Sequence, residues 1–193
     1  GFHAAFDELY KDYLEYVPSA NIVGVDVANR RVKTEFDEYP FNDAAIYPRV
    51  RASKLIETLG LADPKSPQME ANIDPFYYNV KGDMHVYVAG DARPMPYSKS
   101  GNTANSEGKY VAHVVAARAN GKDPGKWQSP HTICYSMVNA DPQEAIMVDA
   151  YYSYNKEKQS FGFYNVKMDQ ERDTAKGIAT LEWARGLYRD MFS

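Results

Sequence analysis

A short strand pattern that ends on a glycine and a carboxylate constrains this chain more than any other feature. Residues 85–89, with the sequence HVYVA, are rich in β-branched and aromatic side chains, and Gly90 and Asp91 follow directly. This composition predicts a strand. Ligands of open sheets bind outside the carboxyl ends of the strands, so we expect Asp91 to lie in a ligand-binding crevice. The alternative is an ordinary aspartate in a turn at a strand end.

A helical pattern over residues 103–119 follows, and both Asn102 and Thr103 are suitable N-cap residues. We expect the unpaired N–H groups and the positive dipole end of this helix to face the same crevice as Asp91. A carboxylate accepts hydrogen bonds from a sugar-like hydroxyl, and a helix N-terminus stabilises negative charge on a ring carbonyl or ring nitrogen. A flavin with its ribityl chain has both kinds of group. One helical face, expected to pack on the sheet, carries Ala104, Gly108, Val111, Ala112 and Val115.

The part of the chain before this stretch has patterns of two helices and several short strands. Helices are predicted over residues 4–16 and 52–59, and strands over residues 22–27, 32–36, 43–47 and 76–80. Pro48 is expected to end the strand over residues 43–47. Residues 61–74 contain prolines and several polar residues, which is typical of a loop and of a crossover between domains.

The pattern changes after residues 121–129, a linker with one proline and two glycines. Three antiparallel strands are predicted over residues 132–138, 145–154 and 161–166, and an amphipathic helix over residues 170–191. A small α+β domain is therefore expected at the C-terminal end. Its second and third strands carry six aromatic residues, half of which alternation should place in the core: Tyr151, Tyr152, Tyr154, Phe161, Phe163 and Tyr164.

Composition and charge exclude several classes of protein. With 193 residues, of which 44% are hydrophobic, the chain is expected to be globular. The net charge of −4 argues against a nucleic-acid partner, and no apolar run is long enough to span a membrane. The single cysteine allows neither an internal disulfide nor a thiolate metal site. His113 has no second ligand at metal spacing, so no metal site is expected.

Five short motifs occur here in a characteristic order: VYVAGDA, PMP, KSGNTANSEGK, HTICYS and, less distinctively, the residues from Trp183 to Phe192. Together they resemble the C-terminal half of the flavoprotein subunit of flavocytochrome c sulfide dehydrogenase, a relative of sulfide:quinone oxidoreductase in the FAD-dependent disulfide oxidoreductase superfamily. The resemblance runs from about Phe6 to the C-terminus. It implies that Asp91 hydrogen-bonds the FAD ribityl chain, that Gly90 belongs to the same cofactor-binding site, and that Lys99, Ser100 and Gly101 lie beside the flavin ring.

The resemblance also implies a fold of α/β plus α+β class, with partial FAD/NAD-binding-like, Rossmann-type domains before the small C-terminal domain. Residues 1–61 would be a remnant of the second nucleotide-binding-like domain, and residues 62–125 the C-terminal part of the FAD-binding domain. Residues 126–193 would be the C-terminal α+β domain. The implied partner is a cytochrome c subunit that carries the haem, since no C-x-x-C-H motif occurs here. The implied location is the periplasm.

Cys134 permits two interpretations. A lone cysteine in an apolar strand is most often an inert buried hydrophobe. Residues three apart on a strand point to opposite faces, so His131 cannot form a Cys–His pair with it. The resemblance instead implies that Cys134 is catalytic, as half of a redox disulfide against the flavin whose second cysteine lies on another segment. Sulfide attack on such a disulfide would give a persulfide and release a thiolate.

FAD needs a glycine-rich turn to hold its pyrophosphate, and no G-x-G-x-x-G occurs in this sequence. We therefore expect this chain to be the C-terminal part of a protein about twice as long, in which the fingerprint lies upstream. Two other functions stay open. One is a sulfide:quinone oxidoreductase, although the acidic residues of the last helix favour a soluble partner over a membrane. The other is a non-catalytic binding or assembly module that presents its aromatic residues to a partner or a second copy. Separately, we expect the fragment to associate through an exposed sheet edge of residues 1–61.

Overall fold

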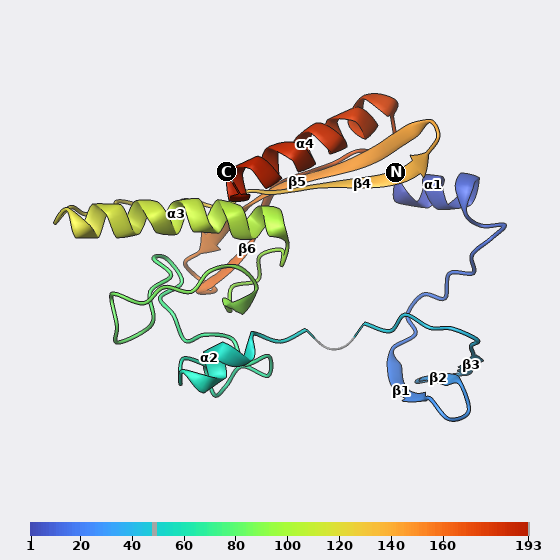
Figure 1. The fold of residues 1–193 in the computed structure, drawn as a ribbon, viewed down its shortest axis with the longest axis horizontal. Coiled ribbons are helices and arrows are strands. Elements are labelled where there is room, and N and C mark those ends of the chain that lie inside the picture. The colour runs from blue at the N-terminus through green and yellow to red at the C-terminus, as the bar shows by residue number, and fades with distance from the viewer. Residues whose placement is uncertain (48–49, 193) are drawn as a thin grey trace. The chain divides into compact units, whose positions relative to one another are not determined.

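The computed structural model describes residues 1–47 and 50–192. The chain divides into two compact units, one of Gly1–Ala5 with Val50–Ser193 and one of Phe6–Arg49. Two small antiparallel sheets and several helices form a mixed α/β structure that ends in a strand and helix domain (Figure 1). The domain boundaries implied by the resemblance, at residues 61 and 125, stay a prediction.

The smaller unit is built on a three-stranded meander. Strands β1 (Ile22–Asp26), β2 (Arg31–Thr34) and β3 (Glu38–Pro40) pair antiparallel in that order. The first two confirm the predicted hairpin. The prediction of a strand over residues 43–47 is wrong, because the chain returns to pair with β2 earlier, at Glu38–Pro40, and residues 43–47 have no bridge partner among the described residues.

Helix α1 (Phe2–Leu9) is much shorter than the predicted helix over residues 4–16. A turn follows it, and the Tyr13 and Leu14 side chains are 85% and 56% exposed. The apolar stripe that would continue the helix therefore lies in solvent, and short helices depend on packing for their stability. Helix α2 (Lys54–Thr58) lies within the predicted range, with Ser53 accepting the Leu55 N–H at its N-terminus.

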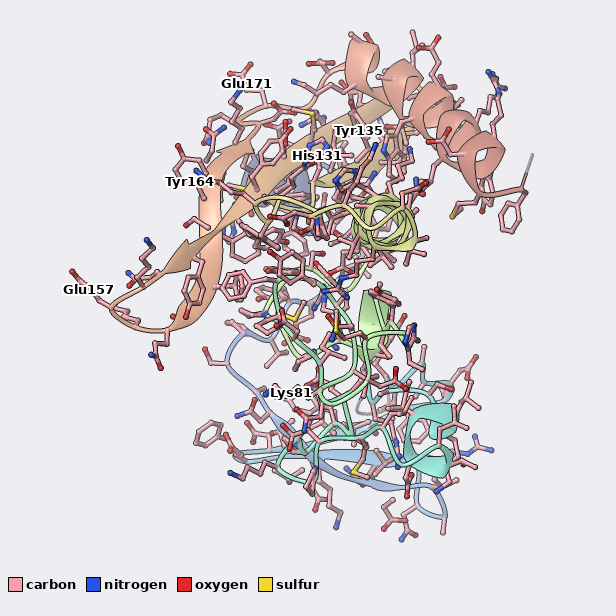
Figure 2. The ribbon with its side chains drawn as sticks, turned by 90° about the vertical axis from the view of Figure 1, so that its left-hand side faces the viewer. Lys81, His131, Tyr135, Glu157, Tyr164 and Glu171 are labelled. Carbon is pink, nitrogen blue, oxygen red and sulfur yellow. The ribbon has the colours of Figure 1, made fainter. Side chains whose placement is uncertain are left out.

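The larger unit is organised around the sheet β4 (Thr132–Ala140), β5 (Gln143–Asn155) and β6 (Ser160–Met168). Both pairings are antiparallel hairpins, as the alternating sequence predicts. Helix α4 (Thr174–Phe192) runs along the β4–β5 hairpin (Figure 1), where the Trp183 ring lies 5.7 Å from the Tyr135 ring. Figure 2 shows Glu157 at the end of the β5–β6 hairpin and Tyr164 on β6. This C-terminal strand and helix domain is confirmed.

The predicted strands over residues 76–80 and 85–89 are wrong. These segments form only isolated bridges, Ile73 with Val80 and Asn79 with Tyr87. Tyr78 has a φ of +64°, which interrupts an extended backbone. Apart from Asn79, no described residue bridges to residues 85–89, and a strand needs a partner along its length. The Rossmann-type sheet is thus not shown in this chain.

Helix α3 (Gly101–Ala119) connects the irregular segment before it to the C-terminal sheet (Figure 1). The expected packing face is wrong, because Gly108, Ala112 and Val115 are exposed. The buried face carries Thr103, Glu107, Tyr110 and Val114. Thr103 and Glu107 can occupy it because their partners Thr132 and Arg93 are buried with them. The core around it includes Tyr78, Val88, Tyr97, Val114 and Tyr152.

Candidate functional site

Gly90 and Asp91 lie in a single 3-10 turn (Gly90–Ala92, η1) beside the first turns of α3. Gly90 has a φ of +70°, and a Cβ atom on it would lie 3.3 Å from the Ala104 Cβ. Its N–H donates to the Glu107 carboxylate over 2.7 Å. The turn therefore needs glycine both for its backbone conformation and for its close approach to the helix.

A buried ion pair holds this turn and the loop after it. The Arg93 Nε lies 2.7 Å from Glu107 Oε1, and the two side chains are 1% and 0% exposed. Arg93 also donates to the carbonyls of Met95 and, over 2.9 Å, of Ser98. Burial raises the pKa of the Glu107 carboxyl, and the Arg93 guanidinium opposes that increase. The sequence analysis missed this pair, although a glutamate among small and apolar helix residues was a signal.

The Asp91 carboxylate is exposed at the surface of this turn and makes no hydrogen bond among the described residues. Its acceptor sites are thus free for a hydroxyl-bearing ligand. The backbone beside it is fixed by Lys99, whose Nζ lies 2.7 Å from Glu70 Oε1 and 2.5 Å from the Asp91 carbonyl oxygen. Lys99 therefore positions the turn, and its contact with a flavin ring stays a prediction.

Helix α3 begins at Gly101, two residues earlier than the predicted start at Thr103. Ser100 is the N-cap, and its Oγ accepts the Thr103 N–H, so the prediction of Asn102 or Thr103 as the cap is wrong. The Asn102 side chain instead binds the neighbouring strand β4, where its Oδ1 accepts the Ile133 N–H over 2.9 Å. Gly101 is exposed, with open space where a Cβ would lie. The structure thus joins Lys99 to the turn of Gly90 and Asp91, and Ser100 and Gly101 begin the helix that this turn contacts. The role of these five residues in cofactor binding stays a prediction.

Cys134 lies on β4, opposite Val148, and is exposed. The interpretation as an inert buried hydrophobe is therefore wrong. Two residues before it, the Thr132 hydroxyl oxygen lies 2.7 Å from that of Thr103 on α3 and 2.8 Å from that of Tyr152. These buried contacts, which sequence reasoning missed, place the strand of Cys134 against the start of α3. The role of Cys134 in catalysis stays a prediction.

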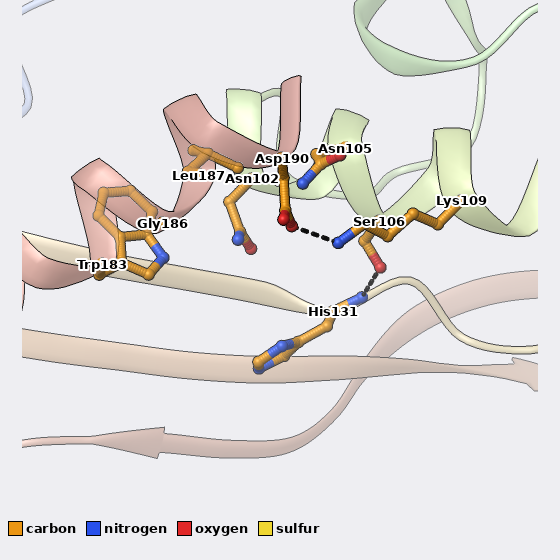
Figure 3. A pocket seen from close by; sticks show the side chains of 9 residues that line it. All are labelled: Asn102, Asn105, Ser106, Lys109, His131, Trp183, Gly186, Leu187 and Asp190. Atoms are coloured by element: carbon orange, nitrogen blue, oxygen red, sulfur yellow. Dashed lines mark hydrogen bonds and ion pairs between the residues drawn. The ribbon is translucent and has the colours of Figure 1, made fainter. Parts of the chain in front are cut away.

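A pocket of about 370 Å³ adjoins the start of α3 (Figure 3). Its walls come from α3, from the beginning of β4 and from α4. Across it, Lys109 and Asp190 form an exposed ion pair, and the His131 ring is held by Asp149 at 2.8 Å. The residues that line it are Asn102, Asn105, Ser106, Lys109, His131, Trp183, Gly186, Leu187 and Asp190.

The aromatic residues of β5 follow the predicted alternation, whereas those of β6 do not. Tyr152 is buried and Tyr151 is exposed. On β6, both Phe163 and Tyr164 are exposed, at 60% and 62% (Figure 2 shows Tyr164). Among the described residues, no group of histidine, cysteine, aspartate and glutamate side chains can hold a metal ion. No helix in the described part of the chain is long and apolar enough to cross a membrane.

Comparison with known families shows a similarity in the C-terminal part of the chain. Residues 129–192 match the family model described as flavocytochrome c sulphide dehydrogenase, flavin-binding. The matched range includes all three strands of the sheet β4–β5–β6, Cys134 and all of α4. The resemblance inferred from the sequence motifs is thus confirmed for this part of the chain, and the match supports a flavoprotein oxidoreductase.

The residues fit one part of a flavin. An exposed carboxylate, at Asp91, and a helix N-terminus with open space at Gly101 match a ribityl hydroxyl and an electron-poor ring. The sequence has no glycine fingerprint for a pyrophosphate. Binding of the ring and ribityl part of FAD by these residues stays a prediction.

Proposed function

We propose that this chain is the C-terminal part of an FAD-dependent sulfide dehydrogenase. The observation that carries the proposal is the family match over residues 129–192, which includes the exposed Cys134 on β4. The pyrophosphate fingerprint, the Rossmann-type sheet and the second redox cysteine would lie on a segment outside this sequence. Sulfide would be the electron donor, and the enzyme would work in the periplasm.

In the proposed reaction Cys134 forms a disulfide with that second cysteine. A hydrosulfide anion attacks one sulfur of the disulfide, so that a new S–S bond forms a persulfide and the old S–S bond breaks to release a thiolate. FAD supplies the acceptor for the two electrons of sulfide oxidation. On this chain, the Asp91 carboxylate would accept hydrogen bonds from the ribityl chain, and the start of α3 at Ser100 and Gly101 would stabilise negative charge that develops on the ring.

The proposed electron acceptor is the haem of a cytochrome c subunit, which takes the two electrons one at a time. A quinone is the second candidate. Helix α4 favours the cytochrome because it carries acidic residues together with its basic ones, whereas a membrane-bound helix is expected to have an apolar face with a basic rim. Reduction of quinone by washed membranes that contain the full-length protein would reverse this choice.

The test replaces Cys134 in the full-length protein. Cys134→Ser should nearly abolish sulfide-dependent reduction of cytochrome c, because serine cannot close a disulfide, while the absorption bands of the bound flavin stay unchanged. Normal turnover would remove Cys134 from the mechanism and with it the link to sulfide. A full-length protein without flavin bands would instead favour a non-catalytic binding or assembly module, which would expose Phe163 and Tyr164 to a partner or to a second copy.

A further inference from the structure

The start of α3 holds three consecutive residues, His131 and the first two residues of β4, and Cys134 is the next residue. The His131 N–H donates to Ser106 Oγ over 2.9 Å (Figure 3). The Thr132 hydroxyl contacts that of Thr103 at 2.7 Å. The Ile133 N–H donates to Asn102 Oδ1 over 2.9 Å. We call these three α3 residues, Asn102, Thr103 and Ser106, the strand clamp.

The spacing of the strand clamp matches the two elements. Asn102 and Ser106 are four residues apart on a helix, which is about 6 Å along its axis. Their partners Ile133 and His131 are two residues apart on a strand, which is about 6.7 Å. Because alternate N–H groups of a strand point to the same side, the N–H groups of His131 and Ile133 both point away from β5 and toward the helix. Strand β4 is an edge of its sheet, so these N–H groups have no strand to pair with.

The clamp fixes the position of Cys134 relative to the N-terminus of α3. Asn102 and Thr103 belong to the same turn as the cap residue Ser100. The Thr132 hydroxyl is held from a second side by Tyr152, at 2.8 Å. Thr103 and Thr132 are buried, at 0% and 5% exposure, so these bonds are shielded from competing water. The exposed sulfur of Cys134 is therefore carried by a backbone that is anchored to the helix.

We propose that Asn102, Thr103 and Ser106 are positioning residues that set the distance between the Cys134 sulfur and a flavin ring at the start of α3. This inference rests on the proposed function. Electron transfer from a thiolate requires close, aligned contact, and a displacement of about 1 Å can reduce such a rate by a factor of about 100. The strand clamp holds the backbone that carries the sulfur at a fixed position relative to the helix, and its three residues act without contacting sulfide.

The main test compares Asn102→Ala and Ser106→Ala in the full-length flavin-loaded protein. Each removes one hydrogen bond to β4 and keeps the Ser100 cap. The matched control is Asn120→Ala, which removes an asparagine side-chain bond to the backbone, Nδ2 to the Ala116 carbonyl over 2.8 Å, at the other end of the same helix. Stopped-flow absorbance measures flavin reduction by sulfide and, separately, by dithionite, which does not use the disulfide.

We expect sulfide-driven reduction to fall at least tenfold in Asn102→Ala, with a further loss in the double variant with Ser106→Ala. Reduction by dithionite should stay within twofold in all variants, and Asn120→Ala should resemble the wild type with both reductants. A general structural defect would slow both reactions together and would overturn the proposal. Sulfide-driven reduction of Asn102→Ala at the wild-type rate would overturn it as well.

A second measurement separates this inference from the proposed function. Amide hydrogen exchange on the present chain reports the Ile133 N–H directly, and Asn102→Ala should remove its protection while the bonds between β4 and β5 stay protected. If the wild-type protein showed no sulfide-driven reduction, the proposed function and the redox role of the clamp would both fail, and loss of Ile133 protection would then establish the clamp alone. Unchanged protection in Asn102→Ala would overturn the clamp itself.

Discussion

The guanidinium of Arg93 and the carboxylate of Glu107 form an ion pair that is almost completely buried, with Nε and Oε1 2.7 Å apart. Glu107 also accepts the Gly90 N–H and the Tyr78 hydroxyl, at 2.7 and 3.3 Å. One carboxylate therefore links α3 to the turn that presents Asp91. Burial of two charges is costly unless their remaining hydrogen-bonding groups are satisfied, as they are here.

Glu107→Gln should destabilise the chain strongly, because it leaves the buried Arg93 guanidinium without a counter-charge. Breaking one partner of a buried pair costs about 3–5 kcal/mol, which urea unfolding followed by circular dichroism measures. Asp190→Asn breaks the exposed pair with Lys109 and should leave the unfolding midpoint unchanged. If Glu107→Gln does not fold, the double variant Arg93→Met with Glu107→Leu should restore folding. Equal effects of Glu107→Gln and Asp190→Asn would contradict the importance of the buried pair.

Gly177→Ala should also destabilise the chain. A Cβ at Gly177 on α4 would lie 2.1 Å from the Gln143 carbonyl oxygen, so the helix must move away from the β4–β5 hairpin. Overpacking of this kind costs about 1–3 kcal/mol. Gly186 lies on the same helix with open space at its Cβ, and Gly186→Ala should stabilise by up to about 1 kcal/mol through helix propensity. Chemical unfolding of Gly177→Ala and Gly186→Ala measures the change in the free energy of unfolding for each variant. Changes of the same sign would be inconsistent with the close approach of Gly177 to the β4–β5 hairpin.

The exposed Cys134 thiol should react with a disulfide reagent such as DTNB in the folded chain. We expect one thiol per chain to react without denaturant, because the side chain is accessible on β4 and is the single cysteine of the sequence. Release of the coloured thiolate at 412 nm follows the reaction, and Cys134→Ser supplies the blank. Reaction that begins only after denaturant is added would show that the thiol is shielded.

Acid should weaken the start of α4 through Asp173. Hydrogen bonds from the Lys176 side chain and from the Lys176 backbone N–H lower the pKa of the Asp173 carboxyl below its ordinary value of 3.8. A carboxyl whose pKa is lower in the folded state than in the unfolded state stabilises the fold at pH values above its unfolded-state pKa. This contribution is lost as the pH falls through the folded-state pKa. Asp173→Asn keeps a capping side chain but does not titrate.

Melting temperatures measured from pH 6 downward test this expectation. The wild type should melt higher than Asp173→Asn at pH 6, and the two should converge as the pH falls below 3.8. Asp141→Asn, in the exposed β4–β5 turn, is the surface control and should follow the wild type throughout. A difference in melting temperature between the wild type and Asp173→Asn that stayed constant down to the lowest pH measured would contradict a lowered pKa of Asp173.

Elements whose partners are close along the chain were predictable from their residue patterns. The hairpins of β4, β5 and β6 and of β1 and β2 follow from alternating side chains that turns bring directly opposite one another. Helices α3 and α4 follow from periodic patterns long enough to form their own hydrogen bonds. The contact of the turn at Gly90 with the first turns of α3 was also predictable, because only a short loop separates them.

Features that depend on partners distant in the sequence became visible in the folded chain alone. The segment over residues 85–89 has strand composition, but no described segment pairs along it, so its backbone forms a single bridge at Tyr87. Glu107 is the centre of a buried hydrogen-bond network because the Arg93 side chain forms an ion pair with it. The contacts of Asn102 and Ser106 with β4 join residues 31 and 25 positions apart. Local pattern cannot specify such contacts, because they depend on which backbone groups the packing leaves without a partner.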